Sequence, residues 1–325
     1  MRAEILRVLK QNAGQYISGE EVSKSLKVSR TAIWKHMQAL REEGYEIDSH
    51  PRQGYCLRTV PDLLLPDEVC PRLETEFVGH SVYYYTSISS TNNEAKRLAN
   101  EGCADGSLIL TEEQKAGRGR LARGWFSPYA KGIWCSVVLR PPFPPQEAPK
   151  CTLLAAVAIA RAIRAAGVDC GIKWPNDILW QGKKLVGILT EMSAEMDAIN
   201  YVVIGMGINV NTASEDFPPE LREIAASLAS IRGQAVSRTQ LLVDLLRELE
   251  SLYVQACREG FDAILKEWRA LSVTLGQTVD IFGINRSFSG QAIDIDSEGA
   301  LLVQTGDGIE RVIAGDVSLR AKPQR

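Results

Sequence analysis

The segment from Gln114 to Pro128 combines residue types that suit a negatively charged ligand. Three arginines (Arg118, Arg120 and Arg123) and three glycines share the eight positions 117–124, and no acid lies among them. Glycine lets backbone N–H groups approach a ligand closely, and the guanidinium group of arginine presents several donors that match phosphate oxygens. The segment therefore fits three functions: a nucleotide site, a nucleic-acid contact, or a solvated basic loop.

The composition of the whole chain is that of a globular protein. It has 325 residues, of which 45% are hydrophobic and 24% charged, and its net charge is −3. This length suits two or three domains. The seven cysteines form no Cys-x-x-Cys pair, and the three histidines lack metal-ligand spacing, which argues against disulfides, zinc and Ser–His chemistry. Without a signal peptide or a membrane-spanning apolar stretch, we expect a cytoplasmic protein with no membrane partner.

The first sixty residues differ in charge from the rest. They carry ten Lys and Arg against seven Asp and Glu, a charge of +3, which leaves −6 for the remainder. Apolar spacing predicts a helix over 2–11, Ser18 to Glu21 form a capping box for a second helix, and Ser29 caps a third over about 30–43. A basic end on an acidic body indicates an anionic partner for that end.

Helix, tight turn and basic helix, followed by a predicted hairpin with its turn at 50–54, indicate a winged helix-turn-helix over residues 1–60. Its second helix enters the major groove of DNA in proteins of this kind. A helical bundle used for protein contact is the alternative. The residues expected at DNA are Arg30, Thr31, Trp34, Lys35, Gln38, Arg41 and Arg52.

The rest of the chain alternates hairpin-spaced strands with helices, after a proline-bracketed linker at 59–66. This pattern predicts an α+β domain over 67–271 with a mixed, mainly antiparallel sheet. A small β domain is expected over 272–325. Its Asp294-x-Asp296-x-Glu298 stretch imitates the start of a calcium loop, but position twelve is Thr305 and strands flank it, so we interpret it as a hairpin turn.

Two common nucleotide scaffolds are excluded by what surrounds their motifs. Gly117-x-Gly119-x-x-Ala122 matches the dinucleotide fingerprint, but the following Trp-Phe-Ser-Pro does not start a helix. Gly182-Lys183-Lys184 lacks the upstream glycine and the Ser or Thr of a Walker loop. A nucleotide would therefore bind on another scaffold.

Five motifs in order resemble those of biotin protein ligases. They are Ser90-Thr91-Asn92, Gln114 with Gly117-Arg118-Gly119-Arg120, Lys173-Trp-Pro-Asn176-Asp177, Lys184-Leu-Val-Gly187-Ile-Leu, and Gly205-x-Gly207-Ile-Asn209-Val-Asn211. With the winged helix in front, the whole chain resembles the bifunctional bacterial members, which are also repressors of the biotin operon. Such a fold would comprise the winged helix, a central ligase domain and an SH3-like barrel.

The resemblance implies an activity and its cofactors. The family joins biotin to ATP, which with Mg²⁺ gives biotinyl-5′-adenylate and pyrophosphate, and then passes biotin to a lysine of biotin carboxyl carrier protein. Attack of a carboxylate on the α-phosphate brings two anions together, so the site needs cations and few acids. The adenylate is also the corepressor, and it promotes a homodimer that binds operator DNA. The Leu185–Tyr201 region is expected at the surface that the homodimer and the carrier protein share.

Site residues follow from the same resemblance. Lys184, Arg118, Arg120 and Asp177 are the catalytic candidates, and Asp177 is also the candidate for Mg²⁺. Roles outside the chemistry remain open for two of them: Lys184 as a surface lysine and Asp177 as a turn cap. The biotin-binding candidates are Ser90, Thr91, Asn92, Gln114, Gly117, Arg118, Lys184, Gly187, Gly205 and Gly207. The ATP-binding candidates are Arg120, Arg123, Trp125, Lys173, Asn176, Asn209, Asn211 and Arg320.

Two other functions compete with this one. A lipoate-type ligase would share the fold and adenylate a similar carboxylate, although the winged helix and the Gly-Arg-Gly-Arg loop argue against it. A DNA-binding regulator that senses a ligand without catalysis would tolerate the loss of Lys184.

The Gly/Arg segment departs from the family pattern at two positions. It has Leu121-Ala122 where some family members carry arginine and glycine, and we expect the loss of that glycine to stiffen the loop.

Overall fold

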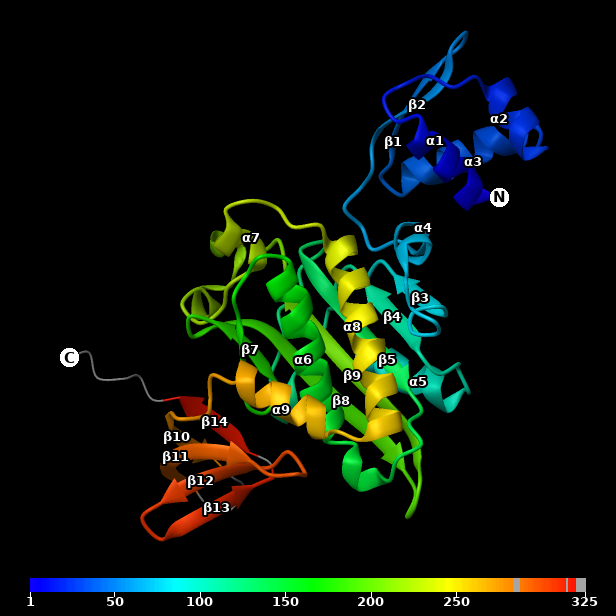
Figure 1. The fold of residues 1–325 in the computed structure, drawn as a ribbon. Coiled ribbons are helices and arrows are strands. Elements are labelled where there is room, and N and C mark those ends of the chain that lie inside the picture. The colour runs from blue at the N-terminus through cyan, green and yellow to red at the C-terminus, as the bar shows by residue number, and fades with distance from the viewer. Residues whose placement is uncertain (283–286, 314, 320–325) are drawn as a thin grey trace. The chain divides into compact units, whose positions relative to one another are not determined.

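The computed structural model describes residues 1–282, 287–313 and 315–319, with the backbone alone for residues 122 and 316. These residues form two compact units, Met1–Leu63 and Leu64–Arg325 (Figure 1). The boundary lies inside the predicted linker, whereas a further division at residue 271 stays a prediction. Across the described ranges, no helix combines the length and the apolar character that crossing a membrane requires.

The first unit is the predicted helix-turn-helix with its wing. Helices α1 (Arg2–Gln11), α2 (Gly19–Leu26) and α3 (Arg30–Glu42) precede strands β1 (Glu46–His50) and β2 (Gly54–Thr59). The caps form as expected, because Ser18 accepts from the N–H of Glu21 and Ser29 accepts from that of Ala32. Ile33, Met37 and Leu40 of α3 are buried, which leaves the opposite face of the helix for a partner.

A seven-stranded sheet forms the centre of the second unit, in the order β3-β4-β5-β9-β8-β7-β6. Only β3 and β4 pair in parallel, so the expectation of a mixed, mainly antiparallel sheet is confirmed. The strands are β3 (Val82–Tyr85), β4 (Ser107–Thr111), β5 (Gly132–Leu139), β6 (Gly171–Lys173), β7 (Asp177–Trp180), β8 (Lys183–Ala194) and β9 (Ile199–Asn209).

Helices cover both faces of this sheet. Helix α6 (Lys150–Ala165) is mostly buried and packs with α8 (Arg238–Glu259) and α9 (Asp262–Leu271) over one face (Figure 1). Helix α5 (Thr91–Asn100) packs Ala95, Leu98 and Ala99 on the other face, in a separate apolar cluster. The short helices are α4 (Pro66–Val69) and α7 (Leu228–Arg232). Every residue of β5 is buried, so the strand lies between two apolar layers.

The C-terminal part is a five-stranded antiparallel sheet in the order β13-β12-β11-β10-β14. Its strands are β10 (Thr278–Phe282), β11 (Ser287–Ile295), β12 (Leu301–Thr305), β13 (Gly308–Val312) and β14 (Asp316–Leu319). The acidic stretch is the predicted hairpin turn, because the Asp296 carboxylate accepts from the backbone N–H groups of Glu298 and Ala300 and pairs with Arg311. Trp174 is buried and donates to the carbonyl of Gly299, so it is a core residue.

Candidate active site

A cavity of about 780 Å³ in the second unit brings most of the predicted site residues together. Within the described part of the chain its lining carries five cations and one carboxylate, Asp177. The cations are Arg118, Arg120, Arg123, Lys173 and Lys184. Because one acid faces five basic side chains, the cavity suits a ligand with several negative charges. Of the three functions that the sequence left open for the Gly/Arg segment, the nucleotide site stays a prediction that this lining favours.

The Gly/Arg loop, residues 117–124, is a short hairpin along the cavity. The Gly117 carbonyl accepts from the N–H of Trp125 at 2.8 Å, and the Gly119 N–H donates to the Arg123 carbonyl at 2.7 Å. Arg120 donates to the Asn176 side chain at 3.3 Å and to the Gly315 carbonyl at 3.1 Å. The tip of the loop is thus held by two residues that directly precede strands, Asn176 before β7 and Gly315 before the C-terminal strand β14. Leu121 takes a left-handed φ of 53°, an uncommon conformation for a residue with a side chain.

Trp125 lies on a floor made by two glycines of adjacent strands. Gly187 of β8 is directly opposite Gly207 of β9. A Cβ atom at Gly207 would come within 2.3 Å of the indole nitrogen, and one at Gly187 would come within 2.9 Å of the indole ring. The indole N–H is buried and has no hydrogen-bond partner among the described residues. Bare backbone at these positions therefore lets the ring lie against the sheet, with a donor available at the cavity.

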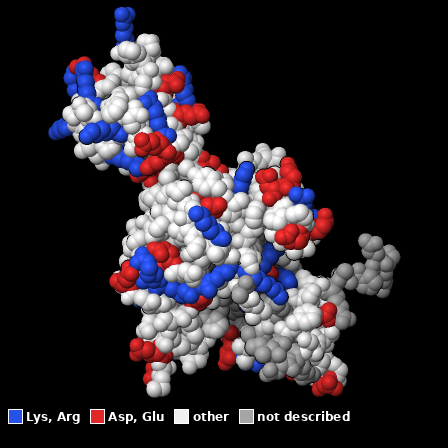
Figure 2. All heavy atoms as spheres, turned by 180° about the vertical axis from the view of Figure 1, so that it is seen from behind, with Lys and Arg blue, Asp and Glu red and all other residues white. Residues whose placement is uncertain are grey.

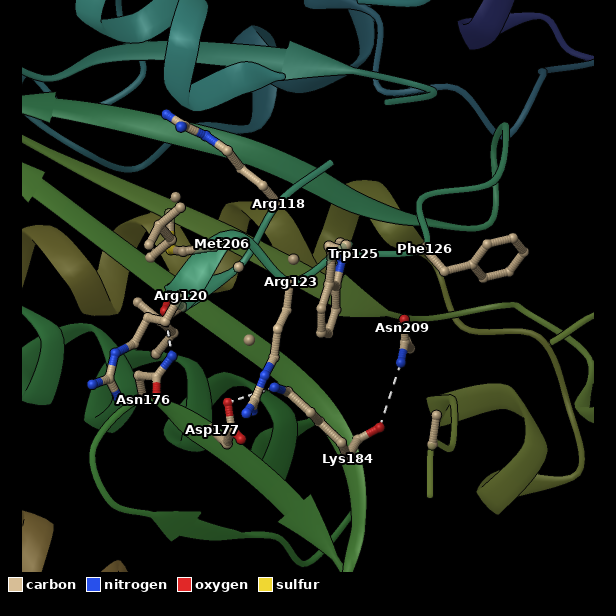
Figure 3. A pocket seen from close by; sticks show the side chains of 18 of the residues that line it. Arg118, Arg120, Arg123, Trp125, Phe126, Asn176, Asp177, Lys184, Met206 and Asn209 are labelled. Carbon is tan, nitrogen blue, oxygen red and sulfur yellow. Dashed lines mark hydrogen bonds and ion pairs between the residues drawn. The ribbon is translucent and has the colours of Figure 1, made fainter. Parts of the chain in front are cut away.

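Lys184 and Asp177 form an ion pair close to Gly187. The Lys184 ammonium is 2.7 Å from the Asp177 carboxylate and 5.3 Å from the centre of the Trp125 ring. Figure 3 shows both side chains, with that of Arg123, directed toward one another. Lys184 is fixed by its backbone as well, because it exchanges hydrogen bonds with Ile224 and Ala226. The lysine is thus a fixed cation beside the cavity.

The Ser90-Thr91-Asn92 motif lies at the start of α5 and lines the cavity. The Gln114 carbonyl oxygen accepts from the backbone and side chain of Thr91, and its amide donates to Ser127 at 3.0 Å. Asn92 accepts from Ser136 and donates to the carbonyl of Leu189. A Cβ at Gly205 would come within 1.9 Å of the Asn92 oxygen, so Gly205 makes room for Asn92. These groups present a rigid polar wall.

The remaining nucleotide candidates separate into two groups. Lys173, Asn176 and Asn209 line the cavity, and Asn209 donates weakly to the Lys184 carbonyl at 3.4 Å. Asn211 lies elsewhere: its side chain donates to the Val236 carbonyl and accepts from the Val236 N–H, which holds the chain just before α8. Arg320 lies outside the described residues, as does the side chain of Asp316.

Sequence reasoning missed the apolar part of the lining. Phe126 packs on Phe217 with ring centres 6.1 Å apart, and Leu221, Ile224 and Ala225 continue the same wall. Residues 213–226 form irregular turns after β9 and have no apolar period to reveal them. Their role follows from the bridge between Lys184 and Ala225, a tertiary contact. One surface of the cavity is therefore apolar and aromatic, which suits a flat ring.

Metal-binding capacity is small in the described part of the chain. It contains no group of three or more His, Cys, Asp or Glu residues that could hold a metal ion. Asp177 alone among the described lining residues offers a carboxylate. A hydrated Mg²⁺ ion held by one protein carboxylate and by substrate phosphates fits this arrangement, because Mg²⁺ keeps several waters.

The DNA-contact candidates lie mostly on the exposed side of α3. Trp34 is 53% exposed, and Thr31, Lys35 and Arg52 are exposed as well. Arg30 pairs with Glu20, whereas Arg41 donates to the carbonyl of Ile47 at 2.9 and 2.7 Å and so joins α3 to β1. Figure 2 shows several basic side chains projecting from this unit on the face drawn, interspersed with acids.

Comparison with known proteins agrees with this geometry. Residues 84–209 match the model of the biotin/lipoate A/B protein ligase family, residues 2–56 match an HTH domain, and residues 274–320 match the biotin protein ligase C-terminal domain. The bifunctional ligase/repressor BirA of Bacillus subtilis is 42% identical over 98% of both chains. That of Escherichia coli is 31% identical over 95% of this chain and 94% of its own.

A solved structure supports the same fold. The biotin protein ligase from Aquifex aeolicus in complex with biotin and ATP has a TM-score of 0.66 and 25% sequence identity, over 75% of this chain and 100% of that one. The two Bacillus and Escherichia relatives extend over both units, including the helix-turn-helix. The chain therefore belongs to the family of bifunctional biotin ligase/repressors.

Proposed function

We propose that this protein joins biotin to ATP and transfers the biotin to a lysine of biotin carboxyl carrier protein. The observation that carries the proposal is the cavity in which five cations and one carboxylate surround a bare glycine floor. A carboxylate and a triphosphate repel each other, and fixed cations reduce that repulsion most in the transition state. The cavity of about 780 Å³ also offers polar and aromatic surfaces for the two ligands.

The first step is attack of the biotin carboxylate oxygen on the α-phosphorus of ATP. The bond to the β-phosphate oxygen breaks, and pyrophosphate leaves with the electron pair. Lys184, Arg120 and Arg123 would stabilise the charge that develops on the phosphate oxygens. When bound, Mg²⁺ would neutralise the departing pyrophosphate, with Asp177 as its protein ligand.

In the second step the uncharged amine of the acceptor lysine attacks the biotinyl carbonyl carbon. The bond between that carbon and the phosphate oxygen breaks, AMP leaves with the electron pair, and the amine nitrogen gives up a proton to solvent as the amide forms. Asp177 is placed to attract the incoming ammonium, because its carboxylate is the one acid in the described lining. The rigid wall of Thr91, Asn92 and Gln114 would hold the ureido ring by hydrogen bonds, and the Phe126–Phe217 wall would contact adenine.

The first unit would repress transcription by binding operator DNA. We propose that α3 reads the major groove through Thr31, Trp34 and Gln38, while Arg30, Lys35 and the wing residue Arg52 contact phosphates. A single module of this size binds weakly, so two copies on a two-part operator are expected, with biotinyl-5′-adenylate promoting the homodimer.

Strand β8 offers a surface for that homodimer or for the carrier protein. Its pairing with β7 ends at Gly187, whereas its pairing with β9 continues to Ala194. Residues 190–194 therefore present a strand edge that β7 does not cover, and Met192 there is 50% exposed. Strand edges readily add a partner strand. A shift in sedimentation on adding biotin, ATP and Mg²⁺ would support the dimer, and an unchanged monomer at all concentrations would contradict it.

Transfer to the carrier protein tests the enzymatic proposal. The protein, ATP, Mg²⁺ and a purified carrier domain are incubated with biotin or with lipoate, and the mass of the acceptor is measured. An increase by one biotin, lost when the acceptor lysine is replaced by arginine, is the expected result. Modification by lipoate alone would identify a lipoate-type ligase, and an unmodified acceptor with ligand-dependent DNA binding would identify a sensor without chemistry.

A further inference from the structure

Glu191 of strand β8 lies just outside the residues that line the cavity and holds several basic or amide groups together. Its carboxylate accepts from the Lys96 ammonium at 2.8 Å and from the Asn92 amide at 2.9 Å. Both of its oxygens also accept from the guanidinium group of Arg118, at 3.1 and 3.2 Å. None of the motifs in the sequence singles out this glutamate, since it stands two residues beyond the motif from Lys184 to Leu189.

The contact with Glu191 sets the direction of the Arg118 side chain. The same guanidinium nitrogen donates to the side chain of Asn93 at 2.7 Å, so an acid and an amide hold it from two sides. Figure 3 shows that Arg118 is directed away from Lys184 and Asp177, whereas Arg123 extends toward them. Arg118 thus differs from the other two loop arginines, and its charge is matched outside the polar centre of the cavity.

Through its position in the loop, Arg118 attaches one side of the hairpin to β8. Arg118 pairs with Gly124 as the two sides of the hairpin, between the hydrogen bonds of Gly117 and Gly119. Arg120, two residues further, holds the tip to Asn176 and Gly315. The first side of the hairpin is therefore fixed to β8 through Glu191, and the tip is fixed separately.

The electrostatics of the cluster favour the ionised glutamate. Burial alone would raise the pKa of Glu191, but hydrogen bonds from Lys96 and Asn92 and the charge of Arg118 together lower it below 4.5. Charge-assisted hydrogen bonds of this kind are stronger than neutral ones. Near neutral pH the carboxylate is charged, so it can hold two cations at once.

We propose that Glu191 is a positioning residue that keeps the Gly/Arg loop closed over the reaction intermediate. It acts through Arg118 and does not touch the reacting atoms. On this proposal, which rests on the proposed adenylation, loss of Glu191 lets the loop open and biotinyl-5′-adenylate escape, while the chemical step that depends on Lys184 is preserved. Arg118 then serves as the loop's attachment point and not as a phosphate contact.

The test compares Glu191→Ala and Glu191→Gln with the full-length protein. Glu195→Ala is the matched control, because Glu195 is an exposed glutamate in the turn that follows the same strand. Two quantities are measured: hydrogen exchange of the backbone amides of residues 116–124, and the rate at which labelled adenylate leaves the protein after dilution into unlabelled biotin and ATP. We expect both Glu191 variants to exchange faster in this segment and to release adenylate about tenfold faster, with the single-turnover rate of adenylate formation changed less than threefold.

A double-mutant cycle with Arg118→Ala assigns the effect to the pair. If Glu191 acts through Arg118, the double variant releases adenylate no faster than either single variant. Additive effects, or Glu191 variants that behave like Glu195→Ala, would overturn the proposal. If Glu191→Ala does not fold, Glu191→Gln keeps the shape of the side chain and carries the test. Hydrogen exchange can be measured without any reaction. If the unaltered protein forms no adenylate, the proposed function is contradicted, and the exchange rates of residues 116–124 still show whether Glu191 holds the loop.

Discussion

The Lys184 ammonium lies 2.7 Å from the Asp177 carboxylate, and the two residues lie at the starts of the neighbouring strands β8 and β7. The carboxylate side chain is 17% exposed and that of the lysine 35%. The ion pair holds the ammonium at the end of the flexible lysine side chain near Gly187. Entry of an anionic ligand would give Lys184 a second partner without moving its backbone, which the hydrogen bonds with Ile224 and Ala226 hold.

Lys184→Ala should reduce the rate of adenylate formation about 100- to 1,000-fold, because a preorganised cation aimed at developing charge contributes that much. Its neighbour provides the control: Lys183 also lies at the start of β8, and its ammonium donates to the Arg222 carbonyl at 3.4 Å. Lys183→Ala should retain nearly full activity in a single-turnover assay. Equal activity of the two variants would exclude Lys184 from the chemistry.

Gly207→Ala should disturb the cavity by displacing Trp125. The added Cβ would lie 2.3 Å from the indole nitrogen, so the ring and the hairpin attached to it must move. We expect at least a tenfold weaker affinity for biotin, measured by isothermal titration, with a nearly unchanged unfolding midpoint. Gly124→Ala is the control within the loop, because a Cβ there meets no atom within 4 Å. A Gly207→Ala protein that binds as tightly as Gly124→Ala would contradict the packing argument.

Breaking the ion pair between Arg238 and Glu112 should destabilise the second unit strongly. Both side chains are 0% exposed and lie 2.8 Å apart, and Glu112 also accepts from the N–H of Leu64 at 2.6 Å. Removing one partner leaves a buried charge, which costs about 3–5 kcal/mol. Arg238→Ala should therefore lower the free energy of unfolding in urea by that amount. The exposed pair of Arg247 and Glu74 is the comparison, and Glu74→Ala should cost less than about 1 kcal/mol.

Two basic residues of α3 should differ in their effect on DNA binding. Lys35 is exposed, so Lys35→Ala should weaken binding and reduce the slope of log affinity against log salt by about 1 if it contacts a phosphate. Arg41 is held by the carbonyl of Ile47, so Arg41→Ala should instead lower the unfolding temperature of the first unit. Fluorescence anisotropy at several salt concentrations and thermal melts would separate the two. A reduced salt slope with an unchanged melt for Arg41→Ala would reverse this assignment.

The Glu191 cluster should give the second unit an acid-sensitive contribution to stability. The pKa of Glu191 is lowered in the folded protein from an ordinary value of 4.5, so ionisation favours folding above that pH. The contribution is lost as the pH falls through the lower folded value, because both states are then protonated. The difference in unfolding free energy between the unaltered protein and Glu191→Gln should thus be constant near pH 6–7 and shrink below pH 4.5. A difference that grows on acidification would contradict the sign.

Local patterns predicted the elements well, because they depend on neighbours in the chain. The caps at Ser18 and Ser29 and the hairpin turn at Asp296 all follow from side chains that bond within a few residues. The cationic part of the cavity was found for a similar reason, since glycine and arginine cluster in one segment. The resemblance to biotin protein ligases then supplied Lys184 and Asp177, which are far from that segment in sequence.

What the sequence did not reveal depends on contacts between distant segments. Glu191 meets Arg118 across 73 residues, and Phe217 meets Phe126 across two loops without a regular pattern. Asn92, expected at biotin, lines the cavity, and its side chain is also bonded to Leu189 and Glu191 of β8, contacts that the motif did not reveal. Asn211 likewise braces Val236. A polar motif residue can bind the ligand or hold neighbouring segments of the protein together. Only the three-dimensional structure shows which of these contacts it makes.

Pyrophosphate–ATP exchange by the purified protein with Mg²⁺ tests the central claim most directly, because exchange requires a reversible adenylate and no acceptor protein. We expect exchange of labelled pyrophosphate into ATP that depends on biotin and is not supported by lipoate. It should be about 100- to 1,000-fold slower in Lys184→Ala and nearly unchanged in Lys183→Ala. Exchange with lipoate alone, or none with biotin while the unaltered protein is folded and binds biotin, would contradict that claim.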